Sequence, residues 1–145
     1  LGCPIGEQVG IEGEEVYFQN GHMLWRPDAS LIYVLFDPAQ AKGWGAFADT
    51  FQPSDPERDP NIVEPTPEAG MQLYVQPTGR FGKLWRENAW LRHALGWAVI
   101  QHIEGQTTTT VHFHGAVQDF EHGVLFWNGK ICFVLRTDDM SWVMY

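Results

Sequence analysis

The chain has 145 residues and a mass of 16.5 kDa, which is enough for one hydrophobic core and predicts a single domain. Hydrophobic residues make up 44% of the sequence and aromatic residues 14%, and so many rings need burial that general disorder is excluded. Nine basic and eighteen acidic residues give a net charge of −9, so nucleic acid and anionic lipid surfaces are not expected partners. No apolar run approaches the length needed for membrane insertion.

Two stretches of the sequence resemble one another, with their motifs in the same order. The matched segments are 1–5 and 95–99, 18–25 and 120–127, 34–35 and 134–135, and 44–47 and 142–145. The offset between them varies from 94 to 102 residues, as expected when loops gain or lose residues while core positions are kept. We therefore predict a duplication, with repeat one in residues 1–51 and repeat two in residues 95–145.

Each repeat has the pattern of a four-stranded antiparallel meander. The first two strands of repeat one flank Asn20-Gly21, a pair typical of a type I′ hairpin turn, and His122-Gly123 stands at the same place in repeat two. A third strand, rich in β-branched and aromatic residues, and a short fourth strand follow in each repeat. We expect a mostly β fold in which the two meanders pack together.

The segment between the repeats, residues 52–94, has a different composition. Residues 49–70 contain five prolines and six acidic residues, a composition that predicts a long acidic Pro-rich loop. Residues 84–95 carry leucines at helical spacing, with Gly96 where a C-terminal cap is expected, and predict one short α-helix. The net charge is +3 over residues 71–95, so we expect this basic helix to lie against the acidic repeats.

Two pairs of residues are candidates for covalent or metal chemistry. Cys3 and Cys132 form a disulfide if the protein is secreted, or else remain two unpaired buried thiols. His112 and His114 lie on the same side of a predicted strand, a spacing found in the metal sites of β-barrel enzymes, with a solvated strand face as the alternative. No catalytic residue is assigned, and no cofactor is expected beyond a metal at this histidine pair.

The aromatic residues divide into repeated and unrepeated positions. The tryptophans at equivalent positions are expected to fill a shared core, and they are Trp25, Trp44, Trp127 and Trp142. The unrepeated rings are free to bind a ligand, and flat rings beside amides and charged groups suit the apolar face and the hydroxyls of a sugar. The candidate ligand-binding residues are Trp85, Trp90, Trp97, Tyr17 and Tyr74.

The motif Leu-Gly-x-Pro at residues 1–4, followed by Phe-x-x-Gly-x-x-x-Trp at 18–25, resembles the LGFP-type repeats of secreted bacterial cell-wall proteins. It is also similar to aromatic-rich tandem modules of secreted proteins from filamentous bacteria. The likeness extends over residues 1–36 and in part over 95–135, whereas Ala98 replaces the proline and the segment between the repeats has no counterpart. The resemblance implies a module of the cell envelope that binds a polysaccharide or cell-wall glycan.

Three functions are therefore open. The first is a secreted or cell-surface, non-catalytic carbohydrate-binding module. The second is a structural or assembly module that packs against other copies or within a longer parent chain. The third is a small metal-dependent enzyme that uses His112 and His114. The start at Leu1 in place of Met is expected for a processed protein or for a segment of a longer one.

Overall fold

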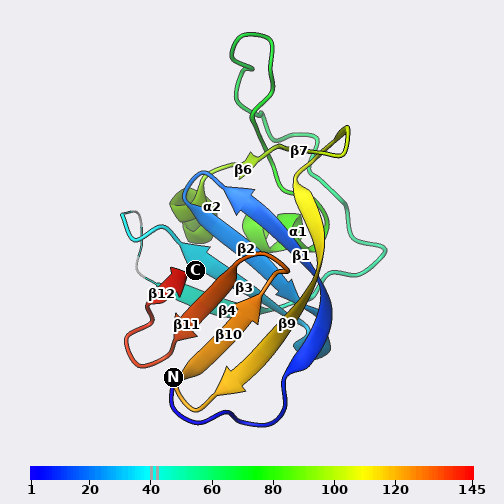
Figure 1. Cartoon of the computed structure of the whole chain (residues 1–145). Helices are drawn as coiled ribbons and strands as arrows, with labels where there is room; N and C mark the ends of the chain where they lie inside the picture. The colour runs from blue at the N-terminus through cyan, green and yellow to red at the C-terminus, as the bar shows by residue number, and fades with distance from the viewer. Residues whose placement is uncertain (40, 42) are drawn as a thin grey trace.

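The fold, obtained as a computed structural model that describes residues 1–39, 41 and 43–145, is mostly β, which confirms the expected class. Four strands come from the first third of the chain: β1 (Val9–Phe18), β2 (Gly21–Arg26), β3 (Leu31–Phe36) and β4 (Trp44–Ala48). Four come from its end: β9 (Thr110–Phe120), β10 (Gly123–Trp127), β11 (Cys132–Arg136) and β12 (Trp142–Met144). They form one antiparallel path in the order β12-β11-β10-β9-β1-β2-β3-β4, which curls until its ends approach each other (Figure 1).

Smaller elements lie between these two sets of strands. They are η1 (Pro27–Ala29), β5 (Tyr74–Val75), α1 (Gly79–Glu87), α2 (Ala89–Leu95), β6 (Ala98–Val99), β7 (Gln101–Ile103) and β8 (Gln106–Thr108). Strand β6 pairs with both β5 and the end of β1, and β7 and β8 form a separate hairpin. The described residues between Ala48 and Tyr74 contain no helix or named strand, only a bridge between Glu68 and Met71.

The prediction of a single helix over residues 84–95 is wrong. The backbone of Asn88 is extended, with φ −125° and ψ 92°, and it separates α1 from α2. The Asn88 side-chain amide donates a hydrogen bond to the Leu84 carbonyl at 2.9 Å, which satisfies one of the carbonyls left free at the end of α1. The backbone of Gly96, with a φ of 74°, then ends α2.

The β1–β2 hairpin forms where the sequence predicts it, but its turn lies one residue earlier. Phe18 pairs with Gly21, so Gln19 and Asn20 are the turn residues, and Asn20 is not among the residues with positive φ. Gly21 itself has a φ of 150°, and a Cβ there would lie 2.1 Å from the Leu35 carbonyl oxygen. The glycine is needed because the neighbouring strand passes so close, rather than for a type I′ turn.

The curled sheet has a hydrophobic core on each of its faces. The inner core is enclosed by the sheet itself and consists of Ile11, Leu24, Tyr33, Leu35, Trp44, Val117, Val124, Phe126, Phe133 and Leu135. The outer core lies between the first strands and the two helices and consists of Val16, Phe18, Met23, Ile32, Val34, Phe36, Phe81, Trp85, Leu91, Leu95 and Ala98. Helices α1 and α2 thus cover the outer face of β1, β2 and β3.

Corresponding backbone contacts occur in the two halves of the molecule. The Leu95 carbonyl accepts a hydrogen bond from the Asn20 amide at 3.0 Å, and the Leu1 carbonyl accepts one from the His122 amide at 2.9 Å. Each leucine comes from the segment that precedes one set of strands and contacts the first hairpin of the other set. The two halves are therefore tied together at both hairpins.

Two tryptophans close the gap between the ends of the sheet. Trp44 Nε1 donates to the Arg136 carbonyl at 2.8 Å, and Trp142 Nε1 donates to the Phe36 carbonyl at 2.9 Å. Trp127 departs from the predicted core role, because it lies on the outer face of β10 and is 47% exposed. The difference arises because no helix lies over that part of the sheet among the described residues (Figure 1).

Candidate functional site

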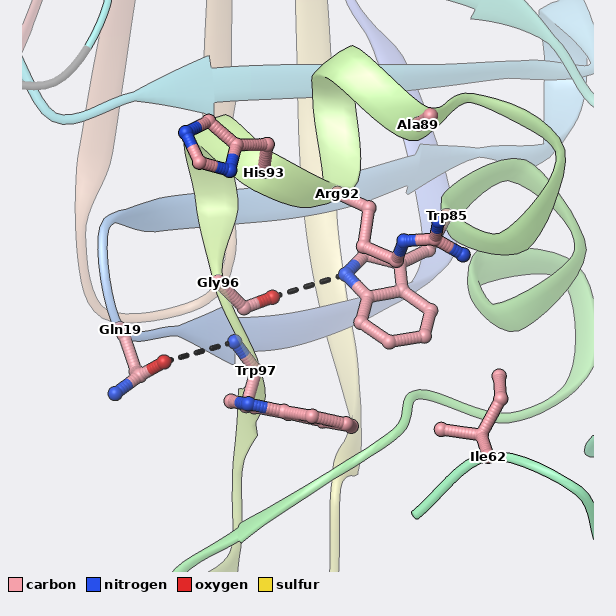
Figure 2. A pocket seen from close by; sticks show the side chains of 8 residues that line it. All are labelled: Gln19, Ile62, Trp85, Ala89, Arg92, His93, Gly96 and Trp97. Atoms are coloured by element: carbon pink, nitrogen blue, oxygen red, sulfur yellow. Dashed lines mark hydrogen bonds between the residues drawn. The ribbon is translucent and has the colours of Figure 1, made fainter. Parts of the chain in front are cut away.

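The candidate site is a cleft beside Trp97, between α2, the β1–β2 turn and the long loop (Figure 2). It consists of two pockets that share Trp97 and Gln19, with volumes of about 520 and 370 Å³. The larger pocket is completed by Ile62, Trp85, Ala89, Arg92, His93 and Gly96. The smaller one is completed by Pro65, Thr66, Glu68, Gln72, Leu73 and Tyr74. We call the two pockets together the Trp97 cleft.

The position of Trp97 is fixed from several sides. Its amide donates to Gln19 Oε1 at 3.0 Å, and its carbonyl accepts from the Gln19 amide at 3.0 Å. The Trp85 ring lies 5.4 Å away, centroid to centroid, at 46°. Because the backbone of Trp97 is held on both sides and its ring packs on a buried neighbour, the indole is a preorganised platform at the edge of the cleft.

Polar groups surround this platform. The Gln19 amide oxygen is used by Trp97, so its Nε2 group is left to serve as a donor at the mouth of both pockets. Arg92 lies 5.5 Å from the centre of the Trp85 ring and brings a cation to the larger pocket, which His93 also lines. In the smaller pocket, Gln72 Nε2 donates to the Pro65 carbonyl at 3.2 Å, which leaves the amide oxygen as an acceptor. Donors and acceptors thus flank an apolar ring.

Trp85, Trp97 and Tyr74 are brought together in the cleft, but with different exposure. Trp85 is only 2% exposed and its Nε1 donates to the Gly96 carbonyl at 2.9 Å. It therefore supports the floor of the cleft as part of the outer core, and only its edge can meet a ligand. Trp97 and Tyr74 are half-buried.

Trp90 and Tyr17 lie outside the Trp97 cleft. Trp90, on α2, is 57% exposed and packs against Phe36 and Phe47, with ring centroids 5.7 and 6.3 Å away. Tyr17 lines a separate pocket of about 350 Å³ beside His22. Burial, followed by the nearby Glu15 carboxylate, raises the pKa of the Tyr17 hydroxyl, which favours its neutral form.

The histidine pair lies on the outer face of β9. His114 Nδ1 is 2.7 Å from Glu12 Oε1, and both side chains are highly exposed; His112 is exposed beside it, opposite Glu14 in the register. Over residues 1–39, 41 and 43–145, no three His, Cys, Asp or Glu side chains gather closely enough to hold a metal ion.

The two cysteines are free thiols in the structure. Cys3 is exposed and Cys132 is partly exposed on β11. The same described residues contain no helix that is long and apolar enough to cross a membrane.

The polar side chains of the cleft, among them Gln19, Gln72 and Arg92, were not predicted from the sequence as site residues. Gln19 is separated from Trp97 by 78 positions and reaches it only because β6 pairs with the end of β1. Arg92 was predicted only as part of a basic helix, and its position near the Trp85 ring links α2 to α1. The only signal in the sequence was the position of Gln19 next to the predicted hairpin turn at Asn20-Gly21.

Comparison with protein-family models, curated proteins and solved structures finds no match to this chain.

Proposed function

We propose that this protein is a secreted or cell-surface, non-catalytic module that binds a polysaccharide or cell-wall glycan in the Trp97 cleft. The observation that carries the proposal is the preorganised Trp97 ring between two pockets lined by amide, guanidinium and imidazole groups. The apolar C–H face of a pyranose stacks on an indole, while planar polar side chains satisfy its hydroxyls. The volume of the larger pocket, about 520 Å³, lies within the range typical of small-ligand sites.

The test is retention of the purified protein on insoluble cellulose, chitin, xylan and peptidoglycan. We expect retention on at least one polymer, and Trp97→Ala should weaken it by roughly thirty-fold, because removing a central aromatic anchor costs about 2 kcal/mol. Trp90→Ala and Trp127→Ala are matched controls, since both rings are exposed but lie outside the cleft. The absence of retention on every polymer, or equal retention of Trp97→Ala, would contradict the proposal.

We also propose that the two halves are diverged copies of one four-stranded unit. The support is that equivalent residues make equivalent contacts. The Gln19 side chain accepts from the Trp97 amide at 3.0 Å, and Glu121 Oε2 accepts from the Cys3 amide at the same distance. Because Cys3 stands at the position equivalent to Trp97, the aromatic platform belongs to one half alone, which suits a function added to a shared framework.

A second candidate function is a structural or assembly role. It is favoured by apolar side chains that remain accessible: Trp127 and Val143 on the outer face of β10 and β12, and Tyr145 directly after β12. Size-exclusion chromatography with light scattering tests self-association directly. If the protein is a monomer at high concentration, self-assembly is excluded. Assembly with other modules then remains as the structural candidate.

A further inference from the structure

The outer face of β9 to β12 carries an apolar surface, which we call the open face. It is formed by Gln118, Leu125, Trp127, Cys132, Val134 and Val143. Trp127 is 47% exposed and Val143 41%, while Leu125, Cys132 and Val134 are each partly exposed. A shallow pocket of about 230 Å³ lies between Gln118, Leu125, Trp127 and Cys132. Large apolar side chains gathered on a sheet face indicate a surface made for contact.

The same positions in the other half of the sheet are already covered. The row Gln118–Leu125–Val134 across three paired strands has the same register as Val16–Met23–Val34. Val16, Met23 and Val34 have no exposed surface, because Phe81 and Trp85 of α1 and Leu91 and Leu95 of α2 pack on them. The open face lies on the same side of the sheet as this interface, and the exposed Glu12–His114 pair on the outer side of β1 and β9 lies between the two. No helix of the described residues lies in front of β10 and β11 (Figure 1).

Leu1 lies where a helix pair packed on the open face would end. The last residue of α2, Leu95, lies against the β1–β2 hairpin, where its Cδ2 atom is 2.8 Å from the point that a Cβ at Gly21 would occupy. Leu1 lies at the corresponding place in the other half, with its Cδ2 atom 2.6 Å from the point that a Cβ at Gly123 would occupy. The anchor that ends the helix pair in one half is therefore present in both.

We propose that the open face is the docking site for a two-helix segment of the α1–α2 kind carried by a partner module. Its apolar side would present rings and leucines at the spacing of Phe81, Trp85, Leu91 and Leu95. Ala116 stands where Glu14 contacts Arg80 in the covered half, so the docked helix needs no arginine at that position. The inference develops the assembly candidate and is independent of glycan binding in the Trp97 cleft.

The test is a chain in which a second copy of residues 77–94 is joined ahead of Leu1, so that the added helix pair ends at the natural anchor. The tether gives the added segment a high effective concentration at the open face. The readout is the rate at which a small maleimide modifies Cys132, followed by mass spectrometry of the digested protein. We expect modification at least tenfold slower than in a matched chain whose added copy carries Phe81→Asp and Trp85→Asp.

One further variant and one peptide experiment make the outcome decisive. Leu125→Asp in the extended chain should restore the faster rate, because it places a charge beneath the docked helices. A synthetic peptide of residues 77–97, added to the unmodified protein, should slow the reaction in proportion to its concentration. Equal rates in the extended chain and its matched control, together with no protection by the peptide, would overturn the proposal, as would protection that Leu125→Asp leaves unchanged.

Other occupants of the open face give different results. If the unmodified chain is a dimer that Leu125→Asp dissociates, the occupant is a second copy and the proposal fails. If Trp127→Ala abolishes retention on a polysaccharide while Trp97→Ala retains it, the open face is a glycan platform, which overturns both this inference and the placement of the glycan in the Trp97 cleft. Loss of retention in Trp97→Ala alone leaves the helix-docking inference intact.

Discussion

The Asn128 side chain holds a carboxylate inside the curled sheet. Its Nδ2 group donates to Glu15 Oε2 at 2.7 Å, and Glu15 is only 1% exposed. Asn128→Ala leaves that buried carboxylate without this donor and also removes the Oδ1 acceptor of the Lys130 and Ile131 amides. It should therefore lower the free energy of unfolding by about 3 kcal/mol. Urea denaturation measures the loss, with the exposed Asn61→Ala expected to stay within about 0.5 kcal/mol of wild type. A loss as small as that of Asn61→Ala would show that Glu15 finds another partner.

A partly buried ion pair between Arg26 and Asp119 makes stability depend on pH. Arg26 donates to both oxygens of Asp119, at 2.6 and 2.7 Å, and these hydrogen bonds hold the pKa of Asp119 below its ordinary value, against the opposing effect of burial. The unfolded pKa is near 3.9, so the stabilisation is present above about pH 4 and is lost as the pH falls through the lower folded value.

Asp119→Asn removes this titration. Its destabilisation relative to wild type should be constant between pH 5 and 7 and should shrink below pH 4, as the wild-type carboxylate becomes protonated. Chemical denaturation of both proteins over this pH series is the measurement. A difference that stays constant down to pH 2.5 would contradict the assignment of the acid dependence to Asp119.

At the same scale, the residues of the candidate site were only partly predictable. The absence of Trp97 from the other repeat pointed to a role outside the shared core, and the structure places it beside two pockets. The same reasoning also selected Trp85, which is buried because it lies on the inward side of α1. Sequence repetition distinguishes shared positions from unshared ones, but burial depends on how a helix is rotated against the sheet.

At the scale of the elements, α1 contains a glycine, Gly82, at which alanine should destabilise the fold. Alanine usually stabilises a helix interior relative to glycine by about 1 kcal/mol. A Cβ at Gly82, however, would lie 2.5 Å from the Pro77 carbonyl oxygen, where the chain enters the helix. Gly82→Ala should therefore lower the free energy of unfolding, by about 1 to 3 kcal/mol.

Thermal and urea unfolding test whether Gly82→Ala lowers the free energy of unfolding, in contrast to the usual effect of alanine in a helix. Gly10→Ala in β1 is the control, because nothing lies within 4 Å of a Cβ there and its φ is not positive. We expect Gly10→Ala to be neutral or slightly stabilising. Stabilisation by Gly82→Ala would mean that α1 shifts away from Pro77 without losing its packing on the sheet.

The strands were more predictable than the elements between them. Runs of β-branched and aromatic residues identified β3, and the β1–β2 hairpin followed from the glycine that separates two apolar runs. The break at Asn88 was not predicted, because the leucine spacing on either side continues a helical pattern while the break depends on how both helices pack over the curled sheet. The turn of the first hairpin shifted because the position of Gly21 is set by Leu35, a residue on another strand.

At the scale of the whole molecule, the sheet has two hydrophobic cores and one seam, by which we mean the place where its end strands β4 and β12 approach each other. The outer core depends on α1 and α2, which cover one half only, while the inner core is shared by strands from both ends of the chain. The two ends of the sheet path are linked by side chains of Trp44 and Trp142, which donate across the seam in opposite directions. Closure of the sheet should therefore depend on two reciprocal hydrogen bonds that are far apart in the sequence.

Replacing these tryptophans by phenylalanine tests how the seam holds. Trp44→Phe and Trp142→Phe keep an aromatic ring but lose the indole donor, so each should lower the free energy of unfolding by about 1 to 2 kcal/mol. The double variant should speed amide hydrogen exchange in β4 and β12, the two strands at the seam, while β1 and β9 at the centre of the sheet remain protected. Hydrogen-exchange mass spectrometry compares the single and double variants under native conditions. Faster exchange spread evenly over all eight strands would show instead that the molecule opens only by global unfolding, and that the seam is not a separate element of stability.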